Sequence, residues 1–123
     1  MSIKLHKRGY DHAVEIIKRG LEIEHDKGNW NEVKPTRDEE VRYLNTHSLE
    51  EYGAWFLGID SSREEQGKVQ YYYQFGDFGM VHLSALENII QEAGKQNHPD
   101  IKDAAQKLVQ MIQQQSASSK NRK

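Results

Sequence analysis

The sequence predicts an α+β fold in which about four helices pack around one two-stranded antiparallel β-hairpin. Four segments repeat apolar residues every three or four positions, which is the spacing of one face of an amphipathic helix. Between them, a short apolar run precedes a segment that alternates apolar and polar side chains, the period of a half-buried strand. A two-stranded hairpin is only marginally stable alone, so the helices must cover its apolar face.

The first helix is predicted over residues 10–24. Gly20 falls inside this segment and weakens the helix by about 1 kcal/mol relative to alanine. Residues 25–35 are rich in turn-forming residues and predict a loop, which Trp30 is expected to anchor on the core. The helical stripe consists of Tyr10, Ala13, Val14, Ile17 and Leu21.

Two capping boxes mark the next helix starts. Thr36 is followed three residues later by Glu39, and Ser48 is followed in the same way by Glu51. In such a box each side chain accepts a hydrogen bond from the other residue's backbone amide, which satisfies N–H groups that a helix start leaves unpaired. The helix after Ser48 should be about one turn long, because Gly53 comes soon after its start. The apolar stripe expected on the helix after Thr36 consists of Val41 and Leu44.

The hairpin is predicted from the runs 54–60 and 68–75, which seven residues join. The first run is short, apolar and aromatic. The second run alternates between two sets of side chains, so one face of the strand should be buried. The first set is Val69, Tyr71, Tyr73 and Phe75, and the second is Gln70, Tyr72 and Gln74.

A turn at residues 76–79 is expected to lead from the hairpin into a helix over residues 80–93. Gly94 is a plausible stop for that helix. The last helix should begin near Pro99, because proline is tolerated in the first turn of a helix. The short link between these two helices predicts that they lie antiparallel and adjacent.

The chain is expected to form one domain over residues 1–115, followed by a disordered polar and basic tail over residues 116–123. A length of 123 residues suits a single domain. The absence of cysteine excludes disulfides, thiol catalysis and cysteine-based zinc sites. With no apolar run that could cross a membrane and no apolar leader, the expected location is the cytoplasm, without membrane contact.

The distribution of charge disfavours nucleic acid as a partner. The formal net charge is −2, and residues 35–79 carry four basic against nine acidic residues. A protein that binds nucleic acid normally presents a concentrated basic face. Here only the C-terminal residues Lys120, Arg122 and Lys123 form a basic group.

Several motifs resemble those of a family of small bacterial proteins with no known activity. Residues 52–60 match its Tyr-Gly-x-Trp-x-Leu-Gly-Ile/Val-Asp segment, and residues 76–86 match its Gly-Asp-Phe and Val-His-x-x-Ala-Leu segments. Residues 98–101 match its His-x-Asp-Ile helix start. The chain departs from the family by lacking its usual proline before Gly-Asp and by a mostly uncharged third helix. The resemblance implies one continuous fold but supplies no function.

Asp77 and His82 are candidate site residues because they meet at the turn between the second strand and the next helix. As a structural pair, Asp77 would cap that helix by accepting from amides at Gly79 or Met80, and His82 would donate to Asp77 or a carbonyl. As a functional pair, they would bind a ligand or catalyse a reaction. Gly76 and Gly79 offer a third alternative, an amide-lined turn that binds an anion. The histidine spacings match no metal motif, and no metal or other cofactor is predicted.

Aromatic residues crowd into residues 43–78 and supply the other candidates. Most of these rings are expected to lie in the core. Strand alternation, however, turns Tyr72 and one of Trp55 and Phe56 away from the buried side, where they are either covered by a helix or exposed as an interface. The predicted binding residues of the hairpin are Trp55, Tyr72 and Tyr73.

The predicted function is a non-enzymatic interaction module that binds a protein partner, or a second copy of itself, through the aromatic face of the hairpin. One alternative is an accessory nucleic-acid-binding protein that uses the hairpin and the basic tail. Base stacking on a sheet needs a basic groove, which an acidic segment does not provide. The other alternative is a small enzyme or ligand-binding protein with a site at Asp77 and His82.

Overall fold

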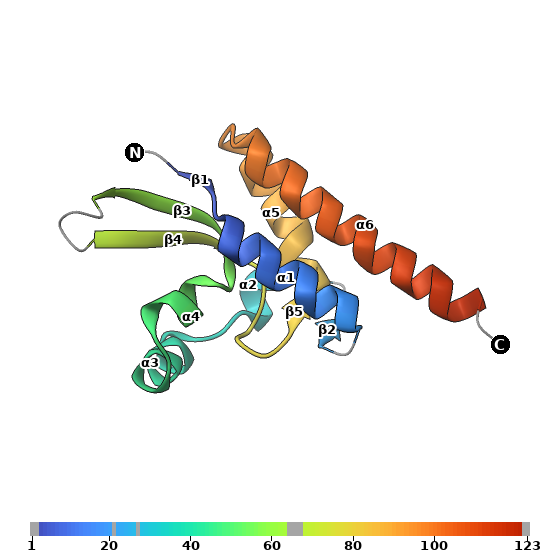
Figure 1. The fold of residues 1–123 in the computed structure, drawn as a ribbon, viewed down its shortest axis with the longest axis horizontal. Helices are drawn as coiled ribbons and strands as arrows, with labels where there is room; N and C mark the ends of the chain where they lie inside the picture. The colour runs from blue at the N-terminus through green and yellow to red at the C-terminus, as the bar shows by residue number, and fades with distance from the viewer. Residues whose placement is uncertain (1–2, 21, 27, 64–67, 122–123) are drawn as a thin grey trace.

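The computed structural model describes residues 3–20, 22–26, 28–63 and 68–121 and confirms the α+β class (Figure 1). Four of the described helices have seven residues or more, and the predicted hairpin is present. The elements in chain order are β1 (Lys4–Leu5), α1 (Lys7–Arg19), β2 (Ile23–Glu24), α2 (Trp30–Val33), α3 (Arg37–Thr46), α4 (Leu49–Gly53), β3 (Phe56–Arg63), β4 (Lys68–Gln74), β5 (Val81–His82), α5 (Leu83–Lys95) and α6 (Pro99–Asn121).

The sheet is larger than the predicted two-stranded hairpin. Strands β3 and β4 pair antiparallel, with Phe56 opposite Gln74, and β1 adds a third antiparallel strand on the far side of β3. Strands β2 and β5 form a separate parallel pair, with Ile23 opposite Val81. The additional strands are two residues long, which is too short for any periodic pattern in the sequence.

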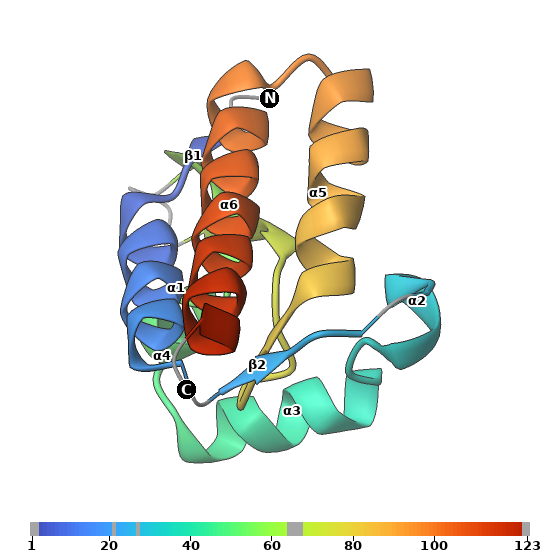
Figure 2. The ribbon, with the colours of Figure 1, turned by 90° about the vertical axis from the view of Figure 1, so that its right-hand side faces the viewer.

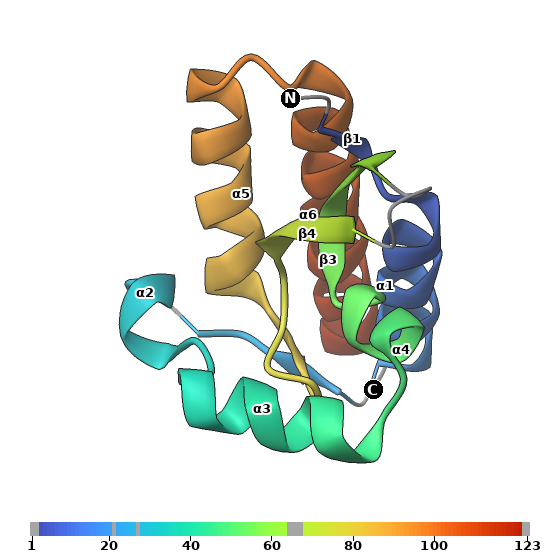
Figure 3. The same ribbon diagram turned by 90° about the vertical axis from the view of Figure 1, so that its left-hand side faces the viewer.

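The long helices gather on one side of the sheet. Helices α5 and α6 lie side by side and antiparallel, as predicted, and α1 lies next to α6 (Figure 2). Helix α3 crosses the end of the molecule opposite the α5–α6 connection (Figure 3). The buried cluster between sheet and helices consists of Ala13, Ile16, Ile17, Trp55, Phe56, Leu57, Phe75, Val81, Leu86, Ile89, Ala93, Ile101, Ala105, Leu108 and Ile112.

The bounds of two helices differ from the prediction. Helix α1 begins at Lys7 and ends at Arg19, because Gly20 adopts a left-handed conformation (φ 71°) and its amide binds the carbonyls of the last turn. The helix predicted from residue 80 begins only at Leu83, because the backbone before it pairs with β2 as strand β5. It continues to Lys95, so the predicted stop at Gly94 is wrong: Gly94 lies within the helix, and Gln96 caps its end. The predicted stripe residue Leu21 lies outside the described residues.

Both capping boxes are confirmed. The side chain of Thr36 accepts from the amide of Glu39, and that of Ser48 accepts from the amide of Glu51; both reciprocal bonds are present. The expected stripe on α3 is wrong as a buried face, because 47% of Val41 and 38% of Leu44 are exposed. Helix α3 instead contacts the rest of the fold through the ring of Tyr43.

Tyr43 stacks between two other rings. Its ring centroid lies 3.8 Å from that of His47 and 4.5 Å from that of Phe78, and both pairs are nearly parallel. Phe78 belongs to the turn after β4, so this stack ties α3 to the hairpin.

Helix α6 continues beyond the domain end that the sequence predicts. Its backbone is helical to Asn121 and so includes residues 116–121 of the predicted tail, while residues 122 and 123 lie outside the described residues. Among the described helices, none is long and apolar enough to cross a membrane.

Candidate functional site

The structure separates the five predicted site residues into three places. Trp55 is in the core, with 5% of its surface exposed. Its neighbour Phe56 is also buried, and the ring of His12 on α1 lies 4.9 Å from that of Trp55, so neither ring is exposed as an interface. Trp55 precedes strand β3, where alternation does not apply, and the rings of Tyr52 and Tyr71 lie against Phe56.

Tyr72 and Tyr73 line a groove of about 370 Å³ beside β4, which we call the aromatic groove. Its walls come from α2, β3, β4 and α5, so residues far apart in the sequence meet there. Five aromatic side chains and four amide side chains contribute to the lining. The full lining is Trp30, Asn31, Lys34, Phe56, Tyr71, Tyr72, Tyr73, Gln74, Asn88, Ile89, Glu92 and Gln96.

Tyr73 lies at one end of the aromatic groove, and its backbone has a strained conformation. Its φ of 64° is unusual for a residue that is not glycine. The hydroxyl of Tyr73 lies 2.7 Å from Nδ1 of His98 and 3.2 Å from Oε1 of Gln96. Burial and then the charges of Glu92 and Asp100 raise the pKa of Tyr73, so the phenol stays neutral well above physiological pH. Strained backbone conformations of this kind cluster at functional sites.

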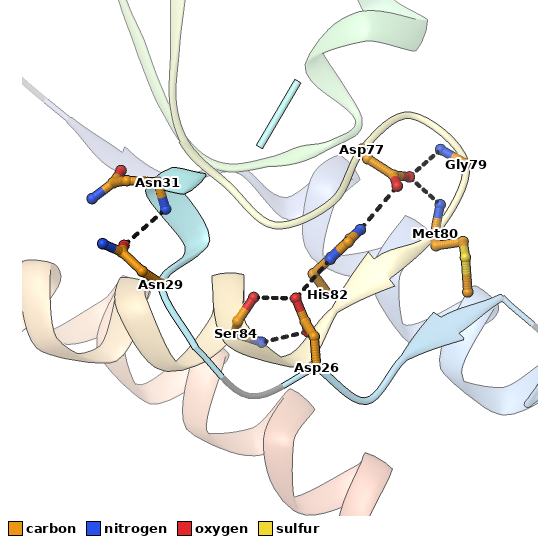
Figure 4. Close-up of polar contacts among 8 residues, drawn as sticks. All are labelled: Asp26, Asn29, Asn31, Asp77, Gly79, Met80, His82 and Ser84. Carbon is orange, nitrogen blue, oxygen red and sulfur yellow. Dashed lines mark hydrogen bonds and ion pairs between the residues drawn. The ribbon is translucent and has the colours of Figure 1, made fainter. Parts of the chain in front are cut away.

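Asp77 and His82 lie elsewhere, in a polar cluster that also includes Asp26 (Figure 4). Nδ1 of His82 lies 3.0 Å from Oδ2 of Asp26, and Nε2 lies 2.9 Å from Oδ2 of Asp77. The ring is therefore held between two carboxylates, and we call these three residues the carboxylate clamp. His82 is buried, with 7% exposed.

Each carboxylate of the clamp is fixed by further hydrogen bonds. Asp26 accepts from the amide of Ser84 at 3.1 Å and from its hydroxyl at 2.5 Å. Asp77 accepts from the amides of Gly79 and Met80, as the structural alternative predicts. Because α5 begins only at Leu83, these bonds close a turn and do not cap a helix, which corrects that part of the prediction.

The clamp favours the charged form of all three groups. Burial alone lowers the pKa of His82, but the hydrogen bonds and charges of Asp26 and Asp77 outweigh it and raise the pKa above its ordinary value. Burial alone raises the pKa of each aspartate, and hydrogen bonds from His82, Ser84 and the turn amides lower both below their ordinary value. Both ring nitrogens can donate at once only when His82 is protonated.

This geometry disfavours a catalytic role for the carboxylate clamp. A histidine that acts as a general base needs one open nitrogen, and both nitrogens of His82 face carboxylates. The hydroxyl of Ser84 donates to Asp26 and is not bonded to His82. The amides of Gly79 and Met80 already bind Asp77, so they are not open to an external anion. Within the described residues no group of three or more acidic or histidine side chains could hold a metal.

Trp30 connects the carboxylate clamp to the aromatic groove. Its ring centroid lies 5.1 Å from that of His82, and the same side chain lines the groove. The sequence indicates Trp30 as an anchor but does not indicate Asp26, which lies 56 residues before His82. No spacing could reveal that pair, because the β2–β5 pairing brings the two segments together.

The clamp predicts that the free energy of unfolding falls at alkaline pH. A histidine whose pKa rises on folding stabilises the fold fully below its unfolded pKa, and this stabilisation is lost as the pH passes the folded pKa. Urea unfolding of the wild type should therefore show a loss of stability as the pH rises above the ordinary pKa of histidine, about 6.5, that His82→Gln does not show.

The test compares the free energy of unfolding of wild type and His82→Gln at each pH. The comparison is needed because burial lowers the pKa of His6, which gives that residue the opposite pH dependence in both proteins. Identical pH profiles for wild type and His82→Gln would contradict the charged clamp.

No family model matches this chain, and no curated protein and no solved structure is significantly similar to it. The resemblance to a family of small bacterial proteins therefore stays a prediction. The function has to be inferred from the aromatic groove and the carboxylate clamp.

Proposed function

We propose that this chain is a non-enzymatic interaction module that binds an uncharged, extended segment of a partner protein in the aromatic groove. The observation that carries the proposal is the lining of the groove, where aromatic rings and amide side chains from four elements share one cavity. Its volume of about 370 Å³ is within the range of natural ligand pockets.

The rings supply the contact area that such binding needs. Tyr71, Tyr72 and Tyr73 are half-buried, and all three belong to the lining of the groove. Tyrosine and tryptophan lose little conformational freedom when they bind, and they are enriched among the residues that contribute most to protein interfaces. Three adjacent tyrosines beside Trp30 therefore favour recognition of a protein segment.

The amides match the chemistry of a peptide backbone. Each asparagine or glutamine side chain carries one hydrogen-bond acceptor and two donors, so it can pair with both the N–H and the C=O groups of an extended chain. Gln74 is oriented by its own bond to the carbonyl of Gly76 at 2.9 Å. Asn31, Asn88 and Gln96 add amides from α2 and from the α5 side.

The charges of the groove favour an uncharged occupant. Lys34 and Glu92 are one basic and one acidic residue, and the other lining residues are uncharged. A single-stranded nucleic acid is held by a groove with a clear excess of basic residues, which this lining lacks. An acid–base enzyme is disfavoured by His82, whose two nitrogens both face carboxylates.

Selection from a displayed library of random peptides tests the proposal on the full chain. The selected peptides should be uncharged and carry an aromatic or aliphatic anchor, and their titration should shift NMR signals of groove residues. Tyr72→Ala should weaken their binding at least about tenfold, the loss typical of a strong interface contact.

Tyr10→Ala is the matched control, because Tyr10 is also half-buried but lies on α1 outside the groove. It should leave the affinity of the selected peptides unchanged. Failure to enrich any peptide, enrichment of strongly charged peptides, or equal losses in both variants would contradict the proposal. A dimer that Tyr72→Ala dissociates, without any selected peptide, would assign the groove to a second copy of the chain and overturn the partner-protein assignment.

A further inference from the structure

Asp26 links the segment before α2 to the β5–α5 junction. Its carboxylate bonds to His82 and makes two bonds to Ser84, and all of these partners lie at the β5–α5 junction. Four residues later comes Trp30, the first residue of the short helix α2. The segment that carries Trp30 into the groove wall is therefore bonded to the carboxylate clamp close to Trp30.

Trp30 also contacts the clamp directly. Its ring lies against the imidazole of His82 with an interplanar angle of 53° and a centroid distance of 5.1 Å. A protonated imidazole is attracted to the face of an indole ring, and the attraction is stronger where water is excluded. Trp30 is 4% exposed and His82 is 7% exposed, so water is largely excluded from this contact.

We propose that the carboxylate clamp positions the aromatic groove: protonated His82 holds Trp30 in the groove wall, and loss of that proton releases Trp30 and weakens binding in the groove. This inference rests on the proposed function for its effect on binding, but the release of Trp30 can be measured without any ligand. Asp26 and Trp30 thereby become positioning residues of the groove.

The release of Trp30 follows from the number of N–H groups on the ring of His82. A neutral imidazole has one N–H group, so it donates to only one of Asp26 and Asp77, and the other carboxylate then faces a ring lone pair. That carboxylate and the lone pair repel each other in a buried site. Among the described residues, Asp26 and Asp77 are the charged groups that act on His82; Glu24, which pairs with it across the β2–β5 ladder, is exposed.

A second histidine stands at the other end of the groove and serves as the matched control. His98 contacts the hydroxyl of Tyr73 and so contributes to that end of the groove. Replacing His98 by glutamine removes that contribution and leaves the clamp intact. Replacing His82 by glutamine removes the clamp and leaves the Tyr73 end intact.

The indole N–H signals of the two tryptophans report the release in an NMR titration of the full chain from about pH 6 to about pH 9. Trp30→Phe assigns the signals. The Trp30 signal should shift or broaden in one transition that coincides with titration of the His82 ring, while the Trp55 signal moves much less. His82→Gln should abolish this transition, and His98→Gln should retain it.

Asp77→Asn keeps the inference testable should His82→Gln fail to fold. The amide still accepts from the turn amides, but the lost charge makes the proton on His82 easier to remove. The Trp30 transition should then move to lower pH together with that of His82. A Trp30 signal that stays constant while His82 titrates, or one whose transition disappears in His98→Gln, would overturn the inference.

Binding provides a separate readout with the peptides selected on the groove. Their affinity should fall at least about threefold across the Trp30 transition, as expected when two thirds of the molecules leave the competent state. A moving Trp30 signal with no selectable peptide contradicts the proposed function and leaves the clamp's control of Trp30 supported. A selectable peptide whose affinity does not change with pH contradicts the inference alone.

Discussion

Replacing Gly9 by alanine is expected to destabilise the fold by about 3 kcal/mol or more, because α1 lies directly on strand β3 at this point. A Cβ atom on Gly9 would lie 1.9 Å from the carbonyl oxygen of Phe56. That oxygen belongs to the backbone of a buried strand and cannot rotate away as the end of a side chain would. The helix would have to move away from the sheet, which would also break the bond from the amide of His6 to the carbonyl of Leu57.

Urea unfolding measures this effect, and Gly94→Ala is the control. Gly94 also lies within a helix, but a Cβ there would come no closer than 3.8 Å to the side chain of Lys102. Alanine at that position should stabilise the protein by about 0.5–1 kcal/mol, since it has the higher helix propensity. A Gly9→Ala protein as stable as the wild type would contradict the close approach of α1 to β3.

Replacing Leu86 or Leu108 by alanine is expected to cost about 2–5 kcal/mol each, the range for a buried leucine whose removal leaves a cavity. Both side chains are fully buried, Leu86 on α5 and Leu108 on α6, where the two helices pack on each other and on the sheet. Leu49→Ala is the matched control, because 46% of that leucine is exposed.

The control should change the free energy of unfolding by less than about 0.5 kcal/mol. A loss that small at both Leu86 and Leu108 would show that the apolar stripes of α5 and α6 do not face the core.

The local features of the fold were predictable from sequence because their causes lie within a few residues of one another. Each capping box uses partners three positions apart, so Thr36 and Ser48 mark the starts of α3 and α4. The alternation of residues 68–75 marks β4 in the same way. Asp77 and the amides of Gly79 and Met80 belong to one turn, so those bonds were also predictable.

The exposure of individual side chains was predicted less well, because it depends on which element packs against them. Val41 and Leu44 have the spacing of a buried stripe, but α3 turns Tyr43 toward Phe78 and leaves the other two side chains 47% and 38% exposed. Trp55 is buried although alternation allows either outcome for it. A helix pattern states which residues share a face; it does not state whether another element covers that face.

The contacts of the candidate site also divide into those that are local in the sequence and those that are not. The proximity of Asp77 to His82 and the gathering of tyrosines on β4 follow from the sequence, because each set is contiguous or nearly so. The contact of Asp26 with the clamp, and the link that Trp30 makes from the clamp to the aromatic groove, follow from the tertiary structure alone. The two-residue strands β2 and β5 bring Asp26 to His82 across 56 positions, and a pairing so short leaves no periodic pattern in the sequence from which it could be predicted.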